Sequence, residues 1–283
     1  MHERHFQLQP LIDMDPYAVH GRLNSSVDML SRDLVKIKGV VNDLVQVMPL
    51  SSSEVNGPKT LVPVHSHQKS TLVMGIVNAT PDSFSDGGKF ESFGEAVSHT
   101  MKLFSDGAEI VDIGGQSTRV GADSVDAAEE LSRVIPVVAG VRSMSKDLAT
   151  KPIISVDTFV ARVAQEALDA GADIINDVSG GDLDEEMFKV VAEYGCPQRN
   201  DKPAFAQFHE QLFVSLLGFP VLVGSSRKGF IGQVTGKKVA SDRVFGTAAT
   251  VTSAIQGNAS IVRVHDVDSM VDVAKVSDRI YRN

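Results

Sequence analysis

From Leu72 onward, short apolar runs alternate with segments whose apolar residues recur at helical spacing. The apolar runs are Leu72–Val77, Glu109–Ile113, Ile153–Val156, Asp173–Asn176, Pro220–Val223 and Ile261–Val264. Helical spacing occurs near residues 93–105, 124–143, 159–170, 184–194, 204–217, 242–256 and 268–281. Short apolar strands that alternate with helices are typical of a parallel sheet whose faces are covered by helices.

Polar residues and glycines follow nearly every predicted strand. This placement favours an α/β fold of the (β/α)8 TIM barrel type, with its site at the C-terminal ends of the strands. The pattern yields six strands, and between Asn176 and Pro220 it shows helical spacing but no strand. We therefore expect a barrel that lacks about two of its eight βα units. A truncated gene model, a splice form or a degenerate copy would each produce such a chain.

The N-terminal part has a different pattern. An apolar stripe with alternating spacings of three and four runs from Val27 to Met48 and predicts one face of a helix. We favour a helix packed on a neighbouring domain over a short coiled coil, because the stripe is short. Residues 49–70 are rich in Ser, Pro and Gly without periodicity, so they are predicted to form a linker. The residues expected to cap or end the helix are Asn24, Ser25 or Ser26 before it and Pro49 after it.

Composition excludes some classes of protein and partner. The 283 residues are 42% apolar and 22% charged, which is ordinary for a soluble globular protein. The net charge of −9 argues against a general nucleic-acid or anionic-membrane partner. A single cysteine, Cys196, excludes an intrachain disulfide and a multi-cysteine metal site. The acidic balance still allows a local cationic pocket, for which the candidates are Arg227, Lys228, Arg263 and His265.

Nothing in the sequence predicts insertion into a membrane or secretion. No apolar run approaches the ~20 residues that span a bilayer, and the N-terminus lacks the apolar core of a secretory signal. We expect a cytoplasmic protein, with the mitochondrion as the alternative compartment.

A long polar loop follows the first predicted strand. The stretch from Thr71 to Gly88 reads TLVMGIVNATPDSFSDGG, and the chain stays polar from Asn78 to Lys89. Most strand-to-helix connections need only about 2–6 residues, so this loop is predicted to be a lid or a binding loop. Further signatures follow in order: DIGGQSTR at 112–119, ISVDT with INDVSGG within 154–181, and SRKGFIG with IVRVHDV within 226–267.

Together these segments resemble the signature sequences of the dihydropteroate synthase family. The resemblance implies a pterin-binding TIM barrel over residues 71–283. It also implies a Mg²⁺-dependent, homodimeric transferase of folate biosynthesis. Such an enzyme joins dihydropterin methyl diphosphate to p-aminobenzoate and releases diphosphate. MHERHFQLQPLIDMDP is similar to the closing segment of hydroxymethyl-dihydropterin pyrophosphokinase, so residues 1–48 are expected to be a remnant of that domain plus the helix, without kinase activity.

The same resemblance assigns roles to individual side chains. Lys228, Arg263 and His265 are implied to be catalytic. An Arg side chain suits phosphate oxygens, and Asn78 would serve the diphosphate and offer an oxygen to Mg²⁺. The remaining implied substrate contacts are Asp157 and Asn176 for the pterin ring, and Phe84, Thr118, Arg119 and Ser226 for the aminobenzoate region.

Three departures from the family pattern bear on function. Val120 stands where proline is usual, which should loosen its loop, and Gln116 stands where Glu is common. A pterin-binding aspartate from the missing strands has no counterpart, because Asp201 lies in a wholly polar setting. Two hypotheses therefore stand side by side: a dihydropteroate synthase, and an impaired remnant that acts as a pterin-binding or interaction module. A pterin-binding methyltransferase is disfavoured, because it predicts neither the SRKG nor the NATPDSFSDGG loop.

Overall fold

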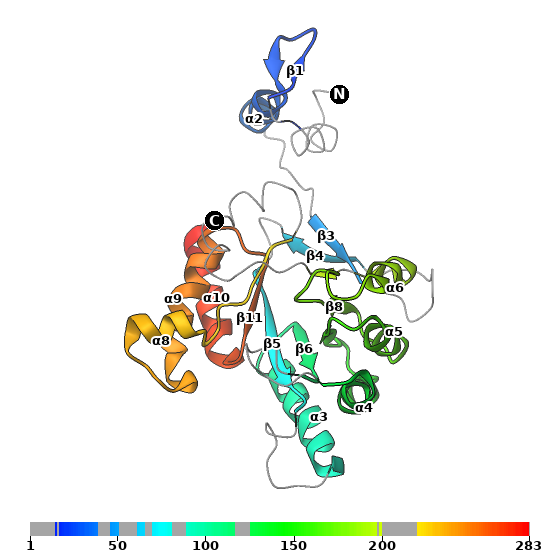
Figure 1. The fold of residues 1–283 in the computed structure, drawn as a ribbon. Coiled ribbons are helices and arrows are strands. Elements are labelled where there is room, and N and C mark those ends of the chain that lie inside the picture. Colours follow the sequence, from blue (N-terminus) through cyan, green and yellow to red (C-terminus); the bar gives the residue numbers. More distant parts are fainter. Residues whose placement is uncertain are drawn as a thin grey trace.

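The computed structural model describes residues 15, 17–38, 46–50, 61–65, 70–80, 89–116, 125–196, 198–199 and 220–282. Among these residues, seven strands form one parallel sheet in the order β10-β11-β5-β6-β7-β8-β9, which is curled into a partial barrel (Figure 1). In chain order the strands are β5 (Leu72–Asn78), β6 (Ile110–Gly114), β7 (Ile153–Asp157), β8 (Ile174–Asn176), β9 (Gln198–Arg199), β10 (Leu222–Val223) and β11 (Ile261–Val264).

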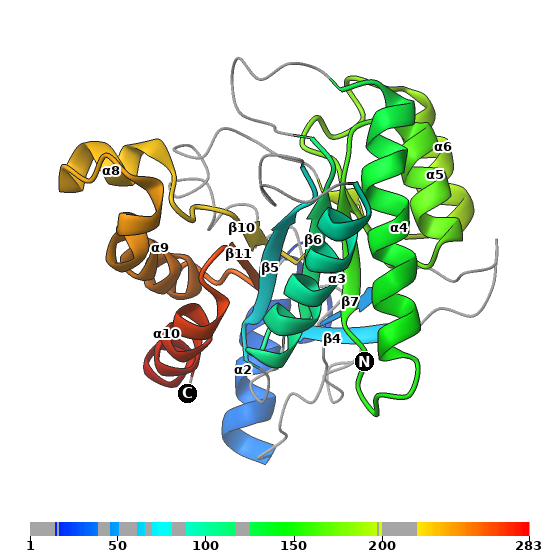
Figure 2. The same cartoon turned by 90° about the horizontal axis from the view of Figure 1, so that it is seen from below.

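Helices cover the outer face of this sheet, as the alternating pattern predicts (Figure 2). They are α3 (Lys89–Ser105), α4 (Ala127–Ser145), α5 (Ala161–Asp169), α6 (Glu186–Tyr194), α9 (Val244–Gln256) and α10 (Val267–Tyr281), with α8 (Gly229–Thr235) and the 3-10 turn η2 (Ala240–Arg243) before α9. The sequence pattern missed α8, and the helix expected over 204–217 lies outside the described residues. None of the helices in the described part of the chain combines the length and apolarity that crossing a membrane requires.

The sheet contains one strand that the sequence pattern did not predict. The expectation that no strand lies between Asn176 and Pro220 is wrong, because β9 pairs in parallel with β8 there. A strand of two residues is too short to show an apolar pattern. Within the described residues β9 and β10 are the two edges of the sheet, and no ladder joins them. The expectation of an α/β barrel with missing units is thus confirmed.

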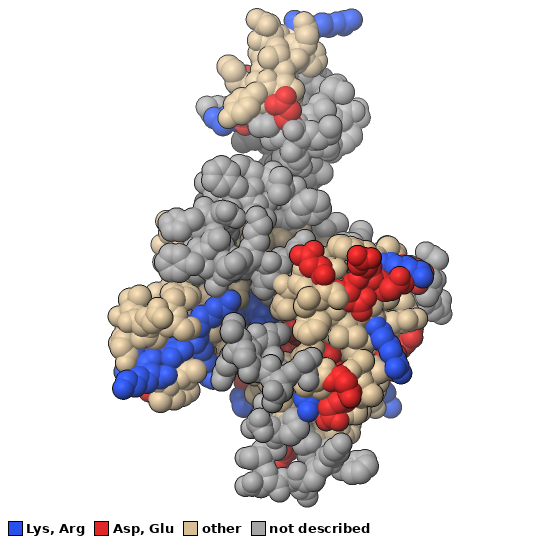
Figure 3. Space-filling view, in the orientation of Figure 1, with Lys and Arg blue, Asp and Glu red and all other residues tan. Residues whose placement is uncertain are grey.

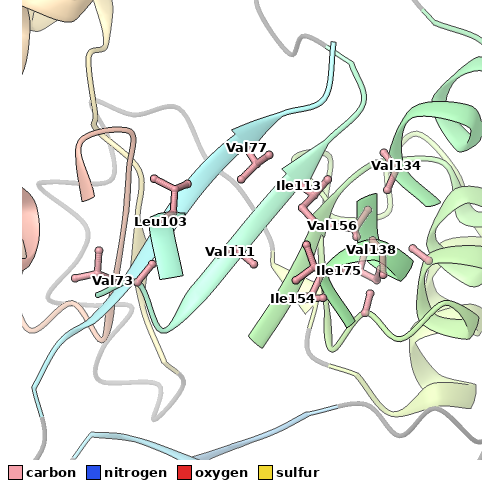
Figure 4. Close-up of a cluster of buried hydrophobic side chains, with 14 of the residues drawn as sticks. Val73, Val77, Leu103, Val111, Ile113, Val134, Val138, Ile154, Val156 and Ile175 are labelled. Atoms are coloured by element: carbon pink, nitrogen blue, oxygen red, sulfur yellow. The ribbon is translucent and has the colours of Figure 1, made fainter. Parts of the chain in front are cut away.

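Strand alternation divides the buried residues into two sets. One set faces the helices and forms the larger core, in which Val73, Val111, Ile154 and Ile175 pack against α3–α6 (Figure 4). The other set faces the barrel interior, where the first residues of the strands form a smaller apolar cluster that includes Ile110. Further along the same strands, toward their C-terminal ends, the interior positions become polar. The candidate site therefore lies at that end of the barrel.

A short hairpin closes the N-terminal end of the barrel. Strands β3 (Gln46–Pro49) and β4 (Leu61–His65) pair antiparallel. Met48 and Leu50, which are 5% and 6% exposed, pack into the apolar cluster at the starts of the barrel strands. The helix that the sequence predicts to Met48 is thus wrong at its end, because residues 46–49 find β partners in the stretch predicted to be a linker.

The start of the predicted N-terminal helix is confirmed. Helix α2 (Val27–Lys38) begins where the apolar stripe begins, and the Ser26 hydroxyl accepts a hydrogen bond from the Met29 backbone N–H at 3.2 Å. This contact is that of an N-cap residue. A two-residue antiparallel pair, β1 (Val19–His20) with β2 (Ser25–Ser26), precedes the helix. Figure 1 shows these elements apart from the barrel.

Candidate active site at the C-terminal ends of the strands

Polar side chains from β7, β8 and β11 share the interior side of the sheet. Asp157 lies opposite Gly114 on one side and Asn176 on the other, and Arg263 lies opposite Met74. Positions of equal parity on paired strands point to the same face. The structure therefore brings together three of the residues that the sequence nominates, Asp157, Asn176 and Arg263, near the C-terminal ends of the strands.

The Arg263 guanidinium bridges two carboxylates. Its Nε donates to Asp112 Oδ2 at 2.6 Å, and its Nη2 donates to Asp157 Oδ2 at 2.8 Å. The side chains are 19% exposed for Arg263, 0% for Asp112 and 10% for Asp157. An ion pair so far removed from water is held by strong, charge-assisted hydrogen bonds, and breaking it would strand a buried charge. This arginine is thus anchored deep in the site rather than extended into solvent.

Asp112 is the site residue that sequence reasoning missed. It lies in the middle of β6, and besides the Arg263 bond it accepts a hydrogen bond from Asn176 Nδ2 at 2.8 Å. Its other oxygen, Oδ1, is buried without a hydrogen-bond partner in the described part of the structure. One signal was available, because a carboxylate within the apolar run Ile110–Ile113 must have a partner once it is buried.

Ser226 and His265 form a second contact, at the ends of β10 and β11. Ser226 Oγ lies 2.9 Å from His265 Nδ1 and also accepts the His265 backbone N–H at 3.2 Å. Burial, together with the positive charges of Arg227 and Arg263, lowers the pKa of His265 to about 4, although Asp266 opposes the shift. The imidazole is therefore neutral at pH 7, and His265 lies two residues after Arg263, just past the end of β11.

The SRKG loop is held in a strained conformation. Arg227 has φ +57°, a left-handed value that is uncommon for a residue with a side chain. Three contacts hold it: its guanidinium pairs with Asp266, its N–H donates to Thr247 Oγ1 at 3.1 Å, and its carbonyl accepts Arg243 Nη1 at 2.9 Å. This frame fixes the backbone of Lys228, whose exposed side chain precedes α8.

The base of the second signature loop is clamped by α4. Gln116 Nε2 donates to Glu130 Oε2 at 3.0 Å, and Arg133 Nη1 donates to the Gly115 carbonyl at 2.8 Å. Burial raises the pKa of Glu130, with opposing contributions from Thr158, Gln116 and Arg133. Gly115 is required here, because a Cβ at that position would lie 2.8 Å from Val134. Phe84, Thr118 and Arg119 lie outside the described residues.

Asn78 ends β5 opposite Gly114, and its side chain is exposed. Its amide oxygen fits a Mg²⁺ ion that keeps most of its waters and takes its other ligands from a substrate phosphate, which is the usual way in which proteins hold this ion. The part of the chain that the structure describes has no group of three or more acidic, His or Cys side chains that could hold a metal by itself. The donor set therefore fits an ion that arrives with the substrate.

Charge is unevenly distributed over the face shown in Figure 3. Lys and Arg side chains form a band that runs from α8 toward the middle of this face, whereas Asp and Glu gather over α4–α6. The band meets the expectation that an acidic protein can still carry a local cationic region, which attracts anions to that side of the mouth.

Comparison with known proteins identifies the family. A family model described as pterin binding enzyme matches residues 74–198 and 204–265. The chain belongs to this family. The break in the match at 199–203 falls in the stretch where the sequence pattern indicates missing units.

Individual relatives agree with the family match. The dihydropteroate synthase of Bacillus subtilis is 41% identical over 75% of this chain and 90% of its own length. A mitochondrial folate synthesis bifunctional protein of Arabidopsis thaliana is 36% identical over 99% of this chain, N-terminal segment included, but this chain spans only 62% of its length. That alignment extends over 351 residues, more than the 283 of this chain, so part of the relative has no counterpart here.

Solved structures show the same fold. A Xanthomonas albilineans dihydropteroate synthase with 4-aminobenzoic acid is 30% identical and superimposes with a TM-score of 0.71, over 84% of this chain and 98% of the other. The curled sheet described above is therefore a dihydropteroate synthase barrel with units missing.

Proposed function

We propose that this chain is a dihydropteroate synthase, condensing a dihydropterin methyl diphosphate with p-aminobenzoate to give dihydropteroate and diphosphate. The observation that carries the proposal is the convergence of Asp157, Asn176 and Arg263 inside the barrel at the C-terminal ends of its strands. Membership of the pterin-binding family supports the reading.

The pterin ring is proposed to bind through its guanidine-like edge. Asp157 offers a carboxylate that accepts paired N–H bonds, and the Asn176 amide serves as donor and acceptor. Both residues are nearly dry, at 8% and 1% exposed as whole residues, so their hydrogen bonds discriminate strongly against rings that lack the matching groups.

Diphosphate leaves from the mouth of the barrel in this proposal. Arg263 and His265 supply N–H donors, and Asn78 together with substrate-borne Mg²⁺ completes the anion site. When bound, the metal ion neutralises charge on the departing diphosphate. The lowered pKa of His265 means that the imidazole is neutral before the anion arrives, and the negative charge of diphosphate then favours its protonated form. Lys228, exposed at the start of α8, adds a cation that contacts the pterin.

The aromatic amine is proposed to lie on the SRKG side of the mouth. The Ser226 hydroxyl or backbone holds its carboxylate, while Phe84, Thr118 and Arg119 of the long loops frame its ring. The amine nitrogen forms the new bond to the methylene carbon as the carbon–oxygen bond to diphosphate breaks, and the amine proton passes to solvent. The amine is unprotonated at neutral pH, so the main task of the site is electrostatic stabilisation of the leaving group.

A direct assay tests the proposal. The folded protein is supplied with dihydropterin methyl diphosphate, p-aminobenzoate and Mg²⁺, and dihydropteroate is quantified by chromatography. We expect slow product formation that is abolished in Arg263→Met. If folded protein neither forms product nor binds a pterin, then both hypotheses, the synthase and the pterin-binding remnant, are refuted.

A second candidate function follows from the interrupted barrel. The two sheet edges at β9 and β10 and the missing pterin aspartate favour a chain that binds pterins without turnover. Saturable pterin binding in the absence of product would select this reading. We further propose a homodimer in the cytoplasm, with the mitochondrion as the alternative, and no kinase activity for residues 1–48. Sedimentation and a kinase assay test the assembly and activity proposals.

A further inference from the structure

The Arg263–Asp157 pair occupies the carboxylate that the proposed pterin edge requires. A guanidinium and the pterin edge present the same chemistry, which is adjacent N–H donors in a plane. In the structure Arg263 Nη2 already uses Asp157 Oδ2, at 2.8 Å. A ring edge that pairs with both oxygens of Asp157 therefore competes with the arginine for Oδ2.

The neighbouring Asp112 can accept the displaced group. Arg263 Nε is bonded to Asp112 Oδ2 at 2.6 Å, while Asp112 Oδ1 is fully buried without a hydrogen-bond partner in the described residues. A guanidinium that stays on Asp112 can bond both oxygens of this one carboxylate, which is the favoured paired geometry for Arg. Its five N–H donors then leave two or more for another ligand.

We propose that Arg263 is a stand-in for the pterin edge. In the empty site its guanidinium pairs with Asp157, which we call the latch. When a pterin binds, the guanidinium leaves Asp157 and stays on Asp112, which we call the pivot. In the empty site Arg263 bridges the two carboxylates, as the structure has it. A pterin ring that takes Asp157 releases the outer N–H groups of Arg263, which then become available to diphosphate. The inference rests on the proposed function and adds to it that the two halves of the substrate bind cooperatively.

Cooperativity follows because each ligand prefers the same arrangement of Arg263. Diphosphate arriving alone must break a nearly dry ion pair, whereas diphosphate arriving after the ring does not. A ligand shifts an equilibrium only through its different affinity for the two states, and the coupling is reciprocal. The ring therefore tightens diphosphate binding, and diphosphate tightens binding of the ring by the same factor.

Calorimetric titration measures this coupling without turnover. The probes are inorganic diphosphate and 6-hydroxymethylpterin, a pterin that carries no diphosphate, at fixed Mg²⁺. For the wild-type protein we expect saturating pterin to lower the Kd of diphosphate by at least about five-fold, the lower end of typical coupling. Binding of both probes with unchanged affinities would overturn the stand-in while leaving the proposed function in place.

Two isosteric variants separate the pivot from the latch. Asp157→Asn frees Arg263, so it should bind diphosphate at least about five-fold more tightly than the wild type without pterin. Asp112→Asn removes the same charge but leaves Arg263 held by Asp157, so it should not gain affinity. Equal gains in both variants would mean that simple loss of negative charge explains the effect, and would overturn the proposal.

Asp147→Asn is the matched control, because Asp147 is exposed in the loop between α4 and β7, at the opposite end of the strands. It should keep the wild-type coupling. Thermal unfolding of each variant establishes that it is folded, and the wild-type titration needs no variant at all. Failure of the wild type to bind either probe would refute the proposed function and, with it, the coupling.

Discussion

Arg263 joins three strands of the site through one side chain. Arg263 belongs to β11, and its guanidinium donates to carboxylates on β6 and β7. These contacts hold the three strands together where the substrates are proposed to bind. His265, just past the end of the same strand, differs: burial beside cations keeps its imidazole uncharged. The site thus has a permanent positive charge on Arg263 and, on His265, a charge that depends on whether an anion is bound.

The lowered pKa of His265 predicts how stability depends on pH. Between pH 6.5 and about 4 the unfolded chain binds a proton at this residue that the folded protein does not, so stability is present above pH 6.5 and is lost as pH falls. We expect the wild type to lose roughly 2 kcal/mol more than His265→Asn between about pH 7.5 and about pH 5, measured by denaturant unfolding.

Ser226→Ala is the control for this prediction, because it removes the hydroxyl contact and keeps the titrating ring. Its unfolding free energy should follow the pH dependence of the wild type. Parallel curves for the wild type and His265→Asn would show that the imidazole does not titrate differently in the folded protein.

At the scale of elements, α4 holds the second signature loop through a neutral–acidic pair. Gln116 donates to Glu130, a side chain with 0% exposure and a raised pKa. Glu is common at position 116 in the family that this sequence resembles, so the amide here removes a potential carboxylate–carboxylate repulsion. In the sequence, Gln116 directly precedes the segment that carries Thr118 and Arg119, the residues proposed to contact the substrates.

Gln116→Glu should make the loop base sensitive to pH. Two buried carboxyls at 3.0 Å spacing must share a proton, so the folded protein would bind more protons than the unfolded chain, and its stability would fall as pH rises. We expect a loss of about 1–3 kcal/mol at pH 8 and a smaller loss at pH 5, measured by urea unfolding.

The control for the loop base is Gln116→Met, which deletes the hydrogen bond without adding a charge. Loss of this hydrogen bond raises the pKa of Glu130 further, so the cost should grow from pH 5 to pH 8, but by less than for Gln116→Glu. If Gln116→Glu lost equal stability at pH 5 and pH 8, the pair would not be desolvated as the structure indicates.

The β3–β4 hairpin is the second element with a measurable role, since it covers the apolar end of the barrel. Leu50 is 6% exposed and packs in the interior cluster. Leu50→Ala should destabilise the protein by about 2–5 kcal/mol through lost burial and a residual cavity. Leu183→Ala, at a side chain that is 67% exposed, should change stability by less than about 0.5 kcal/mol. Similar effects from both changes in denaturant unfolding would show that the hairpin does not seal the barrel.

At the scale of the whole molecule, the described sheet is an open arc. Its edges, β9 and β10, are two residues long each, and short edges limit unwanted pairing with other chains. The family match is interrupted between these edges, at 199–203. The absent units would carry the pterin aspartate, so the open architecture leads us to expect weaker pterin binding.

Restoring the absent units should restore both the barrel and affinity. A chimera takes the corresponding segment of the Bacillus subtilis relative in place of residues 200–219. We expect its urea m-value to rise, because m scales with the surface exposed on unfolding. Its Kd for 6-hydroxymethylpterin should fall about 5–150-fold, which corresponds to about 1–3 kcal/mol from one regained carboxylate. A chimera with the m-value and Kd of the parent chain would count against a loss of whole βα units.

Much of this organisation was predictable from local pattern. The apolar runs located β11 with its bounds, Ile261–Val264, and placed the other long strands within one or two residues. Arg263 was nominated by the resemblance of its segment, IVRVHDV, to the family signature, and the structure places it against the carboxylates of Asp112 and Asp157. The β3–β4 hairpin was not predictable, because the spacing up to Met48 also fits a helix and its partner strand lies within a Ser- and Pro-containing stretch.

The sequence by itself determined the alternation of strands and helices, the parity that turns Asp157, Asn176 and Arg263 inward, and the family to which the chain belongs. These depend on spacing and residue type, which are local properties of the chain. Only the tertiary structure decided that the guanidinium of Arg263 pairs with both Asp112 and Asp157. Those pairings join β11 to β6 and β7, strands more than one hundred residues apart, and which charge finds which partner depends on the register of the folded sheet.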